Sequence, residues 1–198
     1  MKPRVALIVL AAGLSKRFGR NKLLEKIEGK TVIERVVSEA LKSKVDDVIV
    51  VVGHEAERIE EVLKNLPCKL VFNEDYLKGQ SSSVKKGLSV VKELADAVMV
   101  LPGDVALVDS KMMNAIIDEY KKGKSSIVVA GYRERSGHPI LIGRELFREV
   151  EQIDEATMGL KKVMKDHFSK VKIIETSEAA LMDFDTPEEF VRLKERLG

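Results

Sequence analysis

The stretch VALIVLAAGLSKRFGRNK, residues 5–22, determines how the N-terminal part of the chain can fold. It opens with a continuous apolar run, which is typical of a strand buried on both faces. The loop that follows contains two glycines, Gly13 and Gly19. It also contains four basic residues, at Lys16, Arg17, Arg20 and Lys22. A buried strand that leads into such a loop favours a place where backbone amides and positive charge meet an anion.

The rest of the chain repeats this alternation of short apolar runs and longer amphipathic segments. Apolar runs predict strands over residues 5–10, 47–52, 69–72, 97–101 and 126–130. Apolar residues at helical spacing predict helices over residues 31–41, 55–66, 82–94 and 109–122. Later segments predict strands over 139–142 and 171–174, and helices over 144–150, over 157–167 and from Thr186 onward. The pattern predicts an α/β fold: a single-domain, Rossmann-like three-layer α/β/α sandwich whose sheet is mostly parallel, with residues 139–142 as the candidate antiparallel strand.

Composition narrows the classes of partner. The chain has 198 residues, 44% of them hydrophobic, and a net charge of +2 from 34 basic and 32 acidic residues. This mixed charge argues against nucleic acid or a membrane surface as a partner, and small molecules remain. The single cysteine, Cys68, excludes an intramolecular disulfide framework, and no apolar stretch has the length of a membrane span. We therefore expect a cytoplasmic protein.

The basic loop matches neither common phosphate-binding template. Gly13 and Gly19 have the wrong spacing for a P-loop, and Leu14 and Ser15 after Gly13 exclude the GxGxxG fingerprint of dinucleotide-binding folds. Two interpretations remain from the residues alone. One is a long loop whose amides wrap a triphosphate, and the other is a solvated basic connection.

Five ordered stretches carry a resemblance to a known family. LAAGLSKRFGRNK resembles the LAAGxSxRMGxxK signature of the MobA-like nucleotidyltransferases, and of the molybdenum cofactor cytidylyltransferases in particular. Similar stretches follow in order as GQSSSVKKGL, LPGDVALV, GHPILIGRELF and MDFDTPEEF. The resemblance implies a nucleotide-diphospho-sugar transferase-like fold over residues 1–198. It also implies a nucleotide-binding N-terminal part and an acceptor-binding part at residues 132–185.

A magnesium site is expected near Asp104. This residue follows the predicted strand 97–101, so its carboxylate would lie at the edge of the sheet where ligands bind. Mg²⁺ commonly uses one or two carboxylates together with phosphate oxygens. The resemblance implies Asp104, Asp183 and Asp185 as metal ligands. The alternatives are a turn residue for Asp104, and for Asp185 a position beside a helix start at Thr186.

The resemblance also assigns the remaining site residues. It implies catalytic roles for Arg17, Lys22 and Asp104. It implies nucleotide-binding roles for Leu10, Ala11, Ala12, Gly13, Arg17, Lys22, Gln80, Ser82, Ser83 and Asp104. It implies an acceptor-binding segment at Gly137, His138 and Pro139, with His138 in an orienting role. A serine-rich helix N-cap without a ligand is the alternative for the serines.

The activity implied by the resemblance is transfer of CMP from CTP to the terminal phosphate of molybdopterin, with release of pyrophosphate and Mg²⁺ as cofactor. Relatives that use CTP tend to carry AAG at the loop start, as in residues 11–13, whereas guanylyl-transferring ones usually carry AGG. The GDxGAR-like loop of cytidylyltransferases is here DEATMGLKK, in which Lys161 or Lys162 replaces the arginine.

Three alternatives remain: GTP as the nucleotide, a sugar or polyol phosphate as the acceptor, and a non-catalytic nucleotide-binding delivery protein. Transient contact with molybdoenzymes would follow from the molybdopterin reading. The segment RERSGHP, residues 133–139, has the polar, glycine-containing character of a mobile loop.

Overall fold

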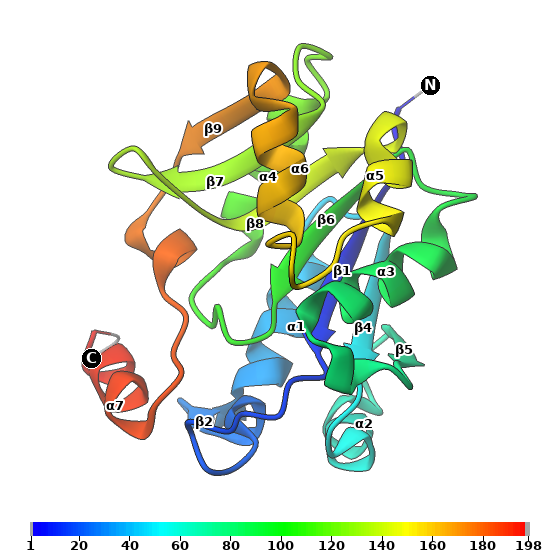
Figure 1. Cartoon of the computed structure of the whole chain (residues 1–198). Helices are drawn as coiled ribbons and strands as arrows, with labels where there is room; N and C mark the ends of the chain where they lie inside the picture. The colour runs from blue at the N-terminus through cyan, green and yellow to red at the C-terminus, as the bar shows by residue number, and fades with distance from the viewer. Residues whose placement is uncertain (1, 197–198) are drawn as a thin grey trace.

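The computed structural model describes residues 2–196, and its centre is a seven-stranded sheet (Figure 1). The strand order is β5-β4-β1-β6-β8-β7-β9. The strands are β1 (Val5–Ala11), β4 (Asp47–Val52), β5 (Lys69–Phe72), β6 (Ala97–Pro102), β7 (Ile127–Tyr132), β8 (Arg135–Gly143) and β9 (Val171–Glu175). Within this sheet β8 is antiparallel to both of its neighbours, and every other neighbouring pair is parallel. The expected mostly parallel sheet with one antiparallel strand is confirmed.

Strand β1 lies between β4 and β6, which explains its continuous apolar sequence. It pairs in parallel with both neighbours, and all seven of its residues are buried. Residues on its two faces enter two different hydrophobic clusters: Leu7 and Val9 belong to one, and Ala6 and Ile8 to the other. A strand covered on both sides needs apolar residues at every position.

Helices cover the sheet on both faces and complete the three layers. Helices α1 (Val32–Lys42), α2 (Ala56–Leu63) and α4 (Ser110–Tyr120) pack on one face. Helices α3 (Gln80–Val91), α5 (Phe147–Glu151) and α6 (Leu160–Asp166) pack on the other (Figure 1). The final helix, α7 (Pro187–Glu195), contributes Phe190 and Leu193 to the first cluster. The predicted α/β/α sandwich is confirmed.

Short elements connect these layers. Strands β2 (Lys26–Ile27) and β3 (Lys30–Thr31) form a separate two-stranded hairpin that the sequence analysis did not predict. Its turn has positive φ at Glu28 and Gly29. The short 3₁₀ helices are η1 (Lys22–Leu24), η2 (Tyr76–Lys78), η3 (Arg144–Leu146), η4 (Phe168–Lys170) and η5 (Glu178–Leu181).

Residues 133–139, which have the composition of a mobile loop, form a turn and the start of a strand. The chain turns at Arg133 and Glu134, and β8 already begins at Arg135. Gly137 lies inside this strand, and position 137 requires a glycine because a Cβ there would come within 2.2 Å of the Ala180 carbonyl oxygen in η5. The glycine permits close packing of backbone on backbone.

Two helix boundaries also differ from expectation. Helix α3 begins at Gln80, with Gly79 as its N-cap, so the serines lie inside the first turns and none of them is the cap. Helix α6 begins at Leu160, later than expected, after a loop with positive φ at Met158 and Gly159. Among residues 2–196, no helix is long and apolar enough to cross a membrane.

Candidate active site

A cavity of about 360 Å³ opens beyond the carboxyl ends of β1 and β6. This is the edge where ligands bind in open α/β sheets. It is lined by the basic loop, by the region from η2 to α3, and by segments after β6 and before α7. The lining residues are Leu10, Ala12, Gly13, Leu14, Ser15, Lys16, Arg17, Lys22, Leu23, Tyr76, Leu77, Gly79, Gln80, Ser83, Pro102, Asp104 and Asp185.

The basic loop offers unused backbone donors to this cavity. Within the described chain, none of the N–H groups of residues 13–17 donates a hydrogen bond to the protein. The loop is held open by its own turn, in which the carbonyl oxygen of Ser15 accepts from the N–H groups of Phe18 and Gly19. Ser15 has a positive φ of 50°, and its Oγ accepts from the Lys22 N–H at 3.3 Å. Such a row of free amides is suited to phosphate oxygens.

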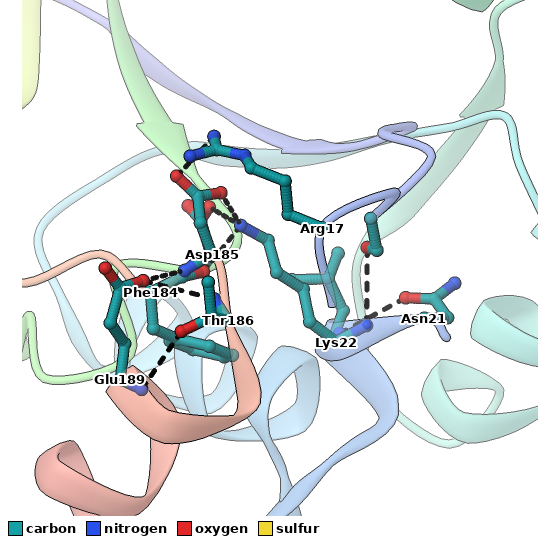
Figure 2. A network of polar contacts seen from close by, with 10 residues as sticks. Arg17, Asn21, Lys22, Phe184, Asp185, Thr186 and Glu189 are labelled. Atoms are coloured by element: carbon teal, nitrogen blue, oxygen red, sulfur yellow. Dashed lines mark hydrogen bonds and ion pairs between the residues drawn. The ribbon is translucent and has the colours of Figure 1, made fainter. Parts of the chain in front are cut away.

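Lys22 forms the centre of a buried charge cluster. Its Nζ lies 2.5 Å from Asp104 Oδ2. It also lies 2.9 Å from Asp185 Oδ1 and donates to the Phe184 carbonyl oxygen at 2.7 Å (Figure 2). Burial alone would lower the pKa of Lys22, but the carboxylates of Asp104 and Asp185 raise it above its ordinary value. Lys22 is therefore a permanent cation on the floor of the cavity.

Arg17 extends this cluster toward solvent. Its Nη2 donates to Asp185 Oδ2 at 2.6 Å, while its side chain remains 72% exposed. Burial would raise the pKa of Asp185, but Lys22 and Arg17 hold it below its ordinary value. The pair between Arg17 and Asp185 is therefore a contact that a phosphate group can exchange at little cost.

An aromatic cluster fixes the basic loop to the C-terminal segment. The ring of Phe18 packs edge-on against Phe184 and Phe190, with centroids 5.8 and 6.0 Å apart. Helix α7 begins with the expected capping box, in which Thr186 and Glu189 satisfy each other's backbone N–H groups. Glu189 Oε2 also accepts from the Asp185 N–H at 2.7 Å (Figure 2). These contacts hold Asp185 beside a loop that lies far from it in sequence.

Asp183 and His138 form a second group of titratable side chains, whose charges act on one another. Burial and the charge of Asp104 raise the pKa of Asp183. Burial lowers the pKa of His138 to about 4, against the opposing charge of Asp183. His138 Nδ1 is buried and has no hydrogen-bond partner in the described chain. His138 is therefore a neutral imidazole near neutral pH.

Many of the residues expected at the site from the sequence come together around the cavity. Those that line it are Leu10, Ala12, Gly13, Arg17, Lys22, Gln80, Ser83, Asp104 and Asp185. Among the described residues, the expected ones that do not line it are Ala11, Ser82, Gly137, His138, Pro139 and Asp183. Ala11 is 1% exposed inside β1, and residues 137–139 belong to β8.

Sequence reasoning missed the wall formed by Tyr76 and Leu77. Leu77 is 70% exposed, which is unusual for a large apolar side chain, and Tyr76 packs against Gly53. The segment connects β5 to α3 and matches no phosphate-binding template. An aromatic residue three positions before a glycine at a helix start was the available signal.

Magnesium fits the donors at this site. Asp104 and Asp185 both contact the same Lys22 ammonium, so two carboxylates lie together in the lining of the cavity. This number and type of donors is what Mg²⁺ uses beside a bound phosphate. Within residues 2–196, no group of three or more His, Cys, Asp or Glu side chains is arranged to hold a metal ion.

Comparison with known families places the chain among nucleotide-using transferases. Residues 7–171 match the model of the MobA-like NTP transferase domain. The chain belongs to this family. The family-level resemblance is thereby confirmed.

Individual relatives are more distant. The bifunctional protein GlmU of Prochlorococcus marinus (strain MIT 9211) is 28% identical over 151 residues, which are 75% of this chain and 33% of GlmU. The chain thus spans about a third of the length of the curated relatives it matches.

Two solved structures resemble this chain over nearly its whole length. The crystal structure of Rv0371c from Mycobacterium tuberculosis H37Rv has a TM-score of 0.88 at 25% identity, covering 98% of this chain and 99% of that one. The complex of Rv0371C with manganese has a TM-score of 0.83 at 24% identity, covering 97% and 98% of the two chains.

Proposed function

We propose that this nucleotidyltransferase transfers CMP from CTP to the terminal phosphate of a molybdopterin-type acceptor and releases pyrophosphate. The observation that carries the proposal is the cavity at the carboxyl edge of the sheet. There, free amides of residues 13–17 face Arg17, Lys22 and Asp104.

The chemistry requires one bond to form and one to break. An oxygen of the acceptor phosphate attacks the α-phosphorus of the nucleotide, and the bond from that phosphorus to the β-phosphate oxygen breaks. The electron pair leaves with pyrophosphate. No general base is needed because the attacking oxygen is already anionic near neutral pH, so catalysis consists of positioning and charge neutralisation.

The residues of the cavity are suited to these tasks. The loop amides and Arg17 bind the β- and γ-phosphates, and Arg17 exchanges its exposed contact with Asp185 for a phosphate oxygen. Lys22, fixed by burial, neutralises charge that develops on the departing pyrophosphate. When bound, magnesium would be held by Asp104 with Asp183 or Asp185 and would neutralise triphosphate charge. The manganese bound by the similar protein Rv0371C supports a divalent cation here.

The choice of CTP rests on a small residue. Ala12 is 4% exposed and lines the cavity, so its methyl group narrows the pocket relative to a glycine. A narrower pocket favours a pyrimidine over a purine, and GTP is the competing nucleotide.

We assign the acceptor to the region around residues 132–185, next to the same cavity. The terminal phosphate of the acceptor would approach from the side of β8, near His138 and Asp183. Lys162 is paired with Asp166, which leaves Lys161, whose charge acts on His138, as the better replacement for the family's arginine. A lysine ammonium cannot make the two parallel hydrogen bonds that a planar arginine side chain makes to one phosphate. A sugar or polyol phosphate is therefore the second candidate acceptor.

The test is pyrophosphate release with magnesium, using CTP, GTP, ATP and UTP in turn, each with molybdopterin as acceptor. Release that requires both CTP and molybdopterin supports the proposal. Release with CTP and a polyol phosphate, and none with molybdopterin, assigns the second acceptor. The Asp104→Asn variant should lose turnover by at least about 100-fold while it remains folded at the assay temperature, as a cooperative unfolding transition above that temperature would show. Wild-type rates in that variant would refute the role of Asp104.

A further inference from the structure

Asn73, which lies directly after β5, is held by hydrogen bonds on every side. It is 2% exposed. Its N–H donates to the Val52 carbonyl oxygen at 2.9 Å, and its own carbonyl oxygen accepts from the Tyr76 N–H at 3.2 Å. Its side-chain Oδ1 accepts from the Asp75 N–H at 3.1 Å. The position of this side chain is therefore fixed by the backbone of the segment that leads to α3.

The last of these contacts determines which way the Asn73 amide faces. A backbone N–H can only donate, so the atom opposite Asp75 must be the oxygen and the NH₂ group must face the other way. That group donates to Ser82 Oγ at 2.9 Å and to Ser83 Oγ at 3.0 Å. Asn73 thus donates one hydrogen bond to each of two serine hydroxyls.

The two serines differ in where their own protons go. Ser82 Oγ donates to carbonyl oxygens of the protein, at 2.7 Å to Gly79 and 2.9 Å to Asp75. Within residues 2–196, Ser83 Oγ has no hydrogen bond other than the one it accepts from Asn73. Ser83 is 4% exposed and lines the cavity. Its proton is therefore directed to the cavity, where a ligand acceptor can meet it.

The part of the ligand that meets Ser83 follows from the neighbouring wall. The free amides of residues 13–17 and Lys22 are suited to bind phosphates. Ser83 lines the same cavity together with the ring of Tyr76 and the apolar side chain of Leu77. An apolar wall with a few neutral polar groups, here including Ser83 and Gln80, is suited to a nucleoside.

We propose that Asn73 is a positioning residue that holds Ser83 as a hydrogen-bond donor to an acceptor oxygen of the nucleoside, either a base carbonyl or a ribose oxygen. The inference rests on the proposed nucleotide site and adds to it a residue outside the cavity lining. Because the Asn73 amide donates to one lone pair of Ser83 Oγ, and the Ser83 hydroxyl donates to no protein group within residues 2–196, its proton is available to the ligand. If residue 73 instead accepted a hydrogen bond from Ser83, the serine hydroxyl would present a lone pair to the ligand in place of its proton.

The Asn73→Asp variant makes this reversal with almost no change in shape. A carboxylate oxygen in place of NH₂ accepts the Ser83 proton, so Ser83 then presents a lone pair to the acceptor oxygen of the ligand. The variant should bind the best of CTP, GTP, ATP and UTP at least about tenfold more weakly by calorimetry, and Ser83→Ala about tenfold more weakly. Combining Asn73→Asp with Ser83→Ala should weaken binding no further than about twofold beyond Ser83→Ala alone.

Two controls separate this role from a structural one. Pyrophosphate has no nucleoside, so its affinity should stay at the wild-type value in Asn73→Asp and Ser83→Ala. Ser89→Ala removes an exposed serine hydroxyl from the same helix, one that donates to the Lys86 carbonyl oxygen, and should bind nucleotide like the wild type. The 2′-deoxynucleotide identifies the hydrogen-bond acceptor atom of the nucleoside. If that atom is the 2′-oxygen, wild type and Ser83→Ala should bind the 2′-deoxynucleotide with equal affinity.

Three results would overturn the inference and are distinct from one another. Wild-type nucleotide affinity in Ser83→Ala would show that Ser83 meets no acceptor. If Asn73→Asp lowered nucleotide affinity by the same factor in the wild type and in Ser83→Ala, Asn73 would act through charge or folding. The same conclusion would follow if Asn73→Asp lowered pyrophosphate affinity as much as nucleotide affinity. Failure of the wild type to bind any of the nucleotides would refute the proposed function itself, whereas the first results leave that function intact.

Discussion

Burial of His138 makes the stability of the fold depend on pH in a calculable way. In the folded protein its pKa is about 4, against 6.5 for an exposed histidine, because the imidazole is enclosed and its Nδ1 has no hydrogen-bond partner in the described chain. Between these two values the unfolded chain binds a proton that the folded chain does not. The stability from a neutral His138 is therefore fully present above the unfolded pKa and is lost as pH falls toward the folded pKa.

The size of the effect follows from the same two values. At about pH 5 the unfolded histidine is protonated and the folded one is not, a difference of about 1.5 pH units or about 2 kcal/mol. The free energy of unfolding, from urea titrations at about pH 7 and pH 5, should fall by about 2 kcal/mol more in the wild type than in His138→Gln. The raised pKa of Asp183 acts in the opposite direction in both proteins, so the comparison removes most of it.

His54→Gln is the matched control. Its imidazole is 37% exposed, and the variant keeps His138, so it should show the same fall in stability as the wild type. Parallel stability curves for wild type and His138→Gln between about pH 7 and pH 5 would refute the reasoning. They would show that His138 is solvated or paired in the folded protein.

Three further perturbations test other parts of the account. Arg17→Ala should lower kcat/KM for the nucleotide by about 10- to 100-fold, in steady-state kinetics, while unfolding stays within about 0.5 kcal/mol of wild type because the ion pair is exposed; unchanged kinetics would remove Arg17 from the phosphate site. Gly87→Ala should destabilise the protein by about 1–3 kcal/mol in urea titrations, since its Cβ would lie 2.4 Å from Ile8 Cγ2 in the core; Gly123→Ala, where a Cβ meets nothing within 4 Å, controls for the space but adds strain from its φ of 68°. Ala12→Gly should widen the pocket and raise the GTP rate relative to the CTP rate, and an unchanged ratio would leave the choice of nucleotide to other residues.

The sheet and its covering helices could be predicted because burial on both faces leaves a strong mark on a sequence. The run of residues 5–10 and the amphipathic spacing of α1 each specify their environment locally. The β2–β3 hairpin could not be predicted in the same way, because two-residue strands are too short to show a period. The close approach of Gly137 to the Ala180 carbonyl oxygen could not be predicted either, because close backbone packing and flexibility both call for glycine.

The site could be predicted only as far as its residues lie in recognisable stretches. Arg17 and Asp185 were each singled out, but their pairing joins positions 168 residues apart and depends on the packing of Phe18 against Phe184. Asn73 lies outside the stretches that carry the resemblance. Its importance follows from the direction of one amide, which no sequence pattern reveals.

The most direct test of nucleotidyl transfer follows the label of each phosphate. CTP labelled at the α- or the γ-phosphate is incubated with the protein, magnesium and molybdopterin, and the products are separated. The account predicts that the α-label moves to the acceptor and the γ-label appears in pyrophosphate. Transfer of the γ-label to the acceptor, or release of the α-label only as free CMP, would contradict it.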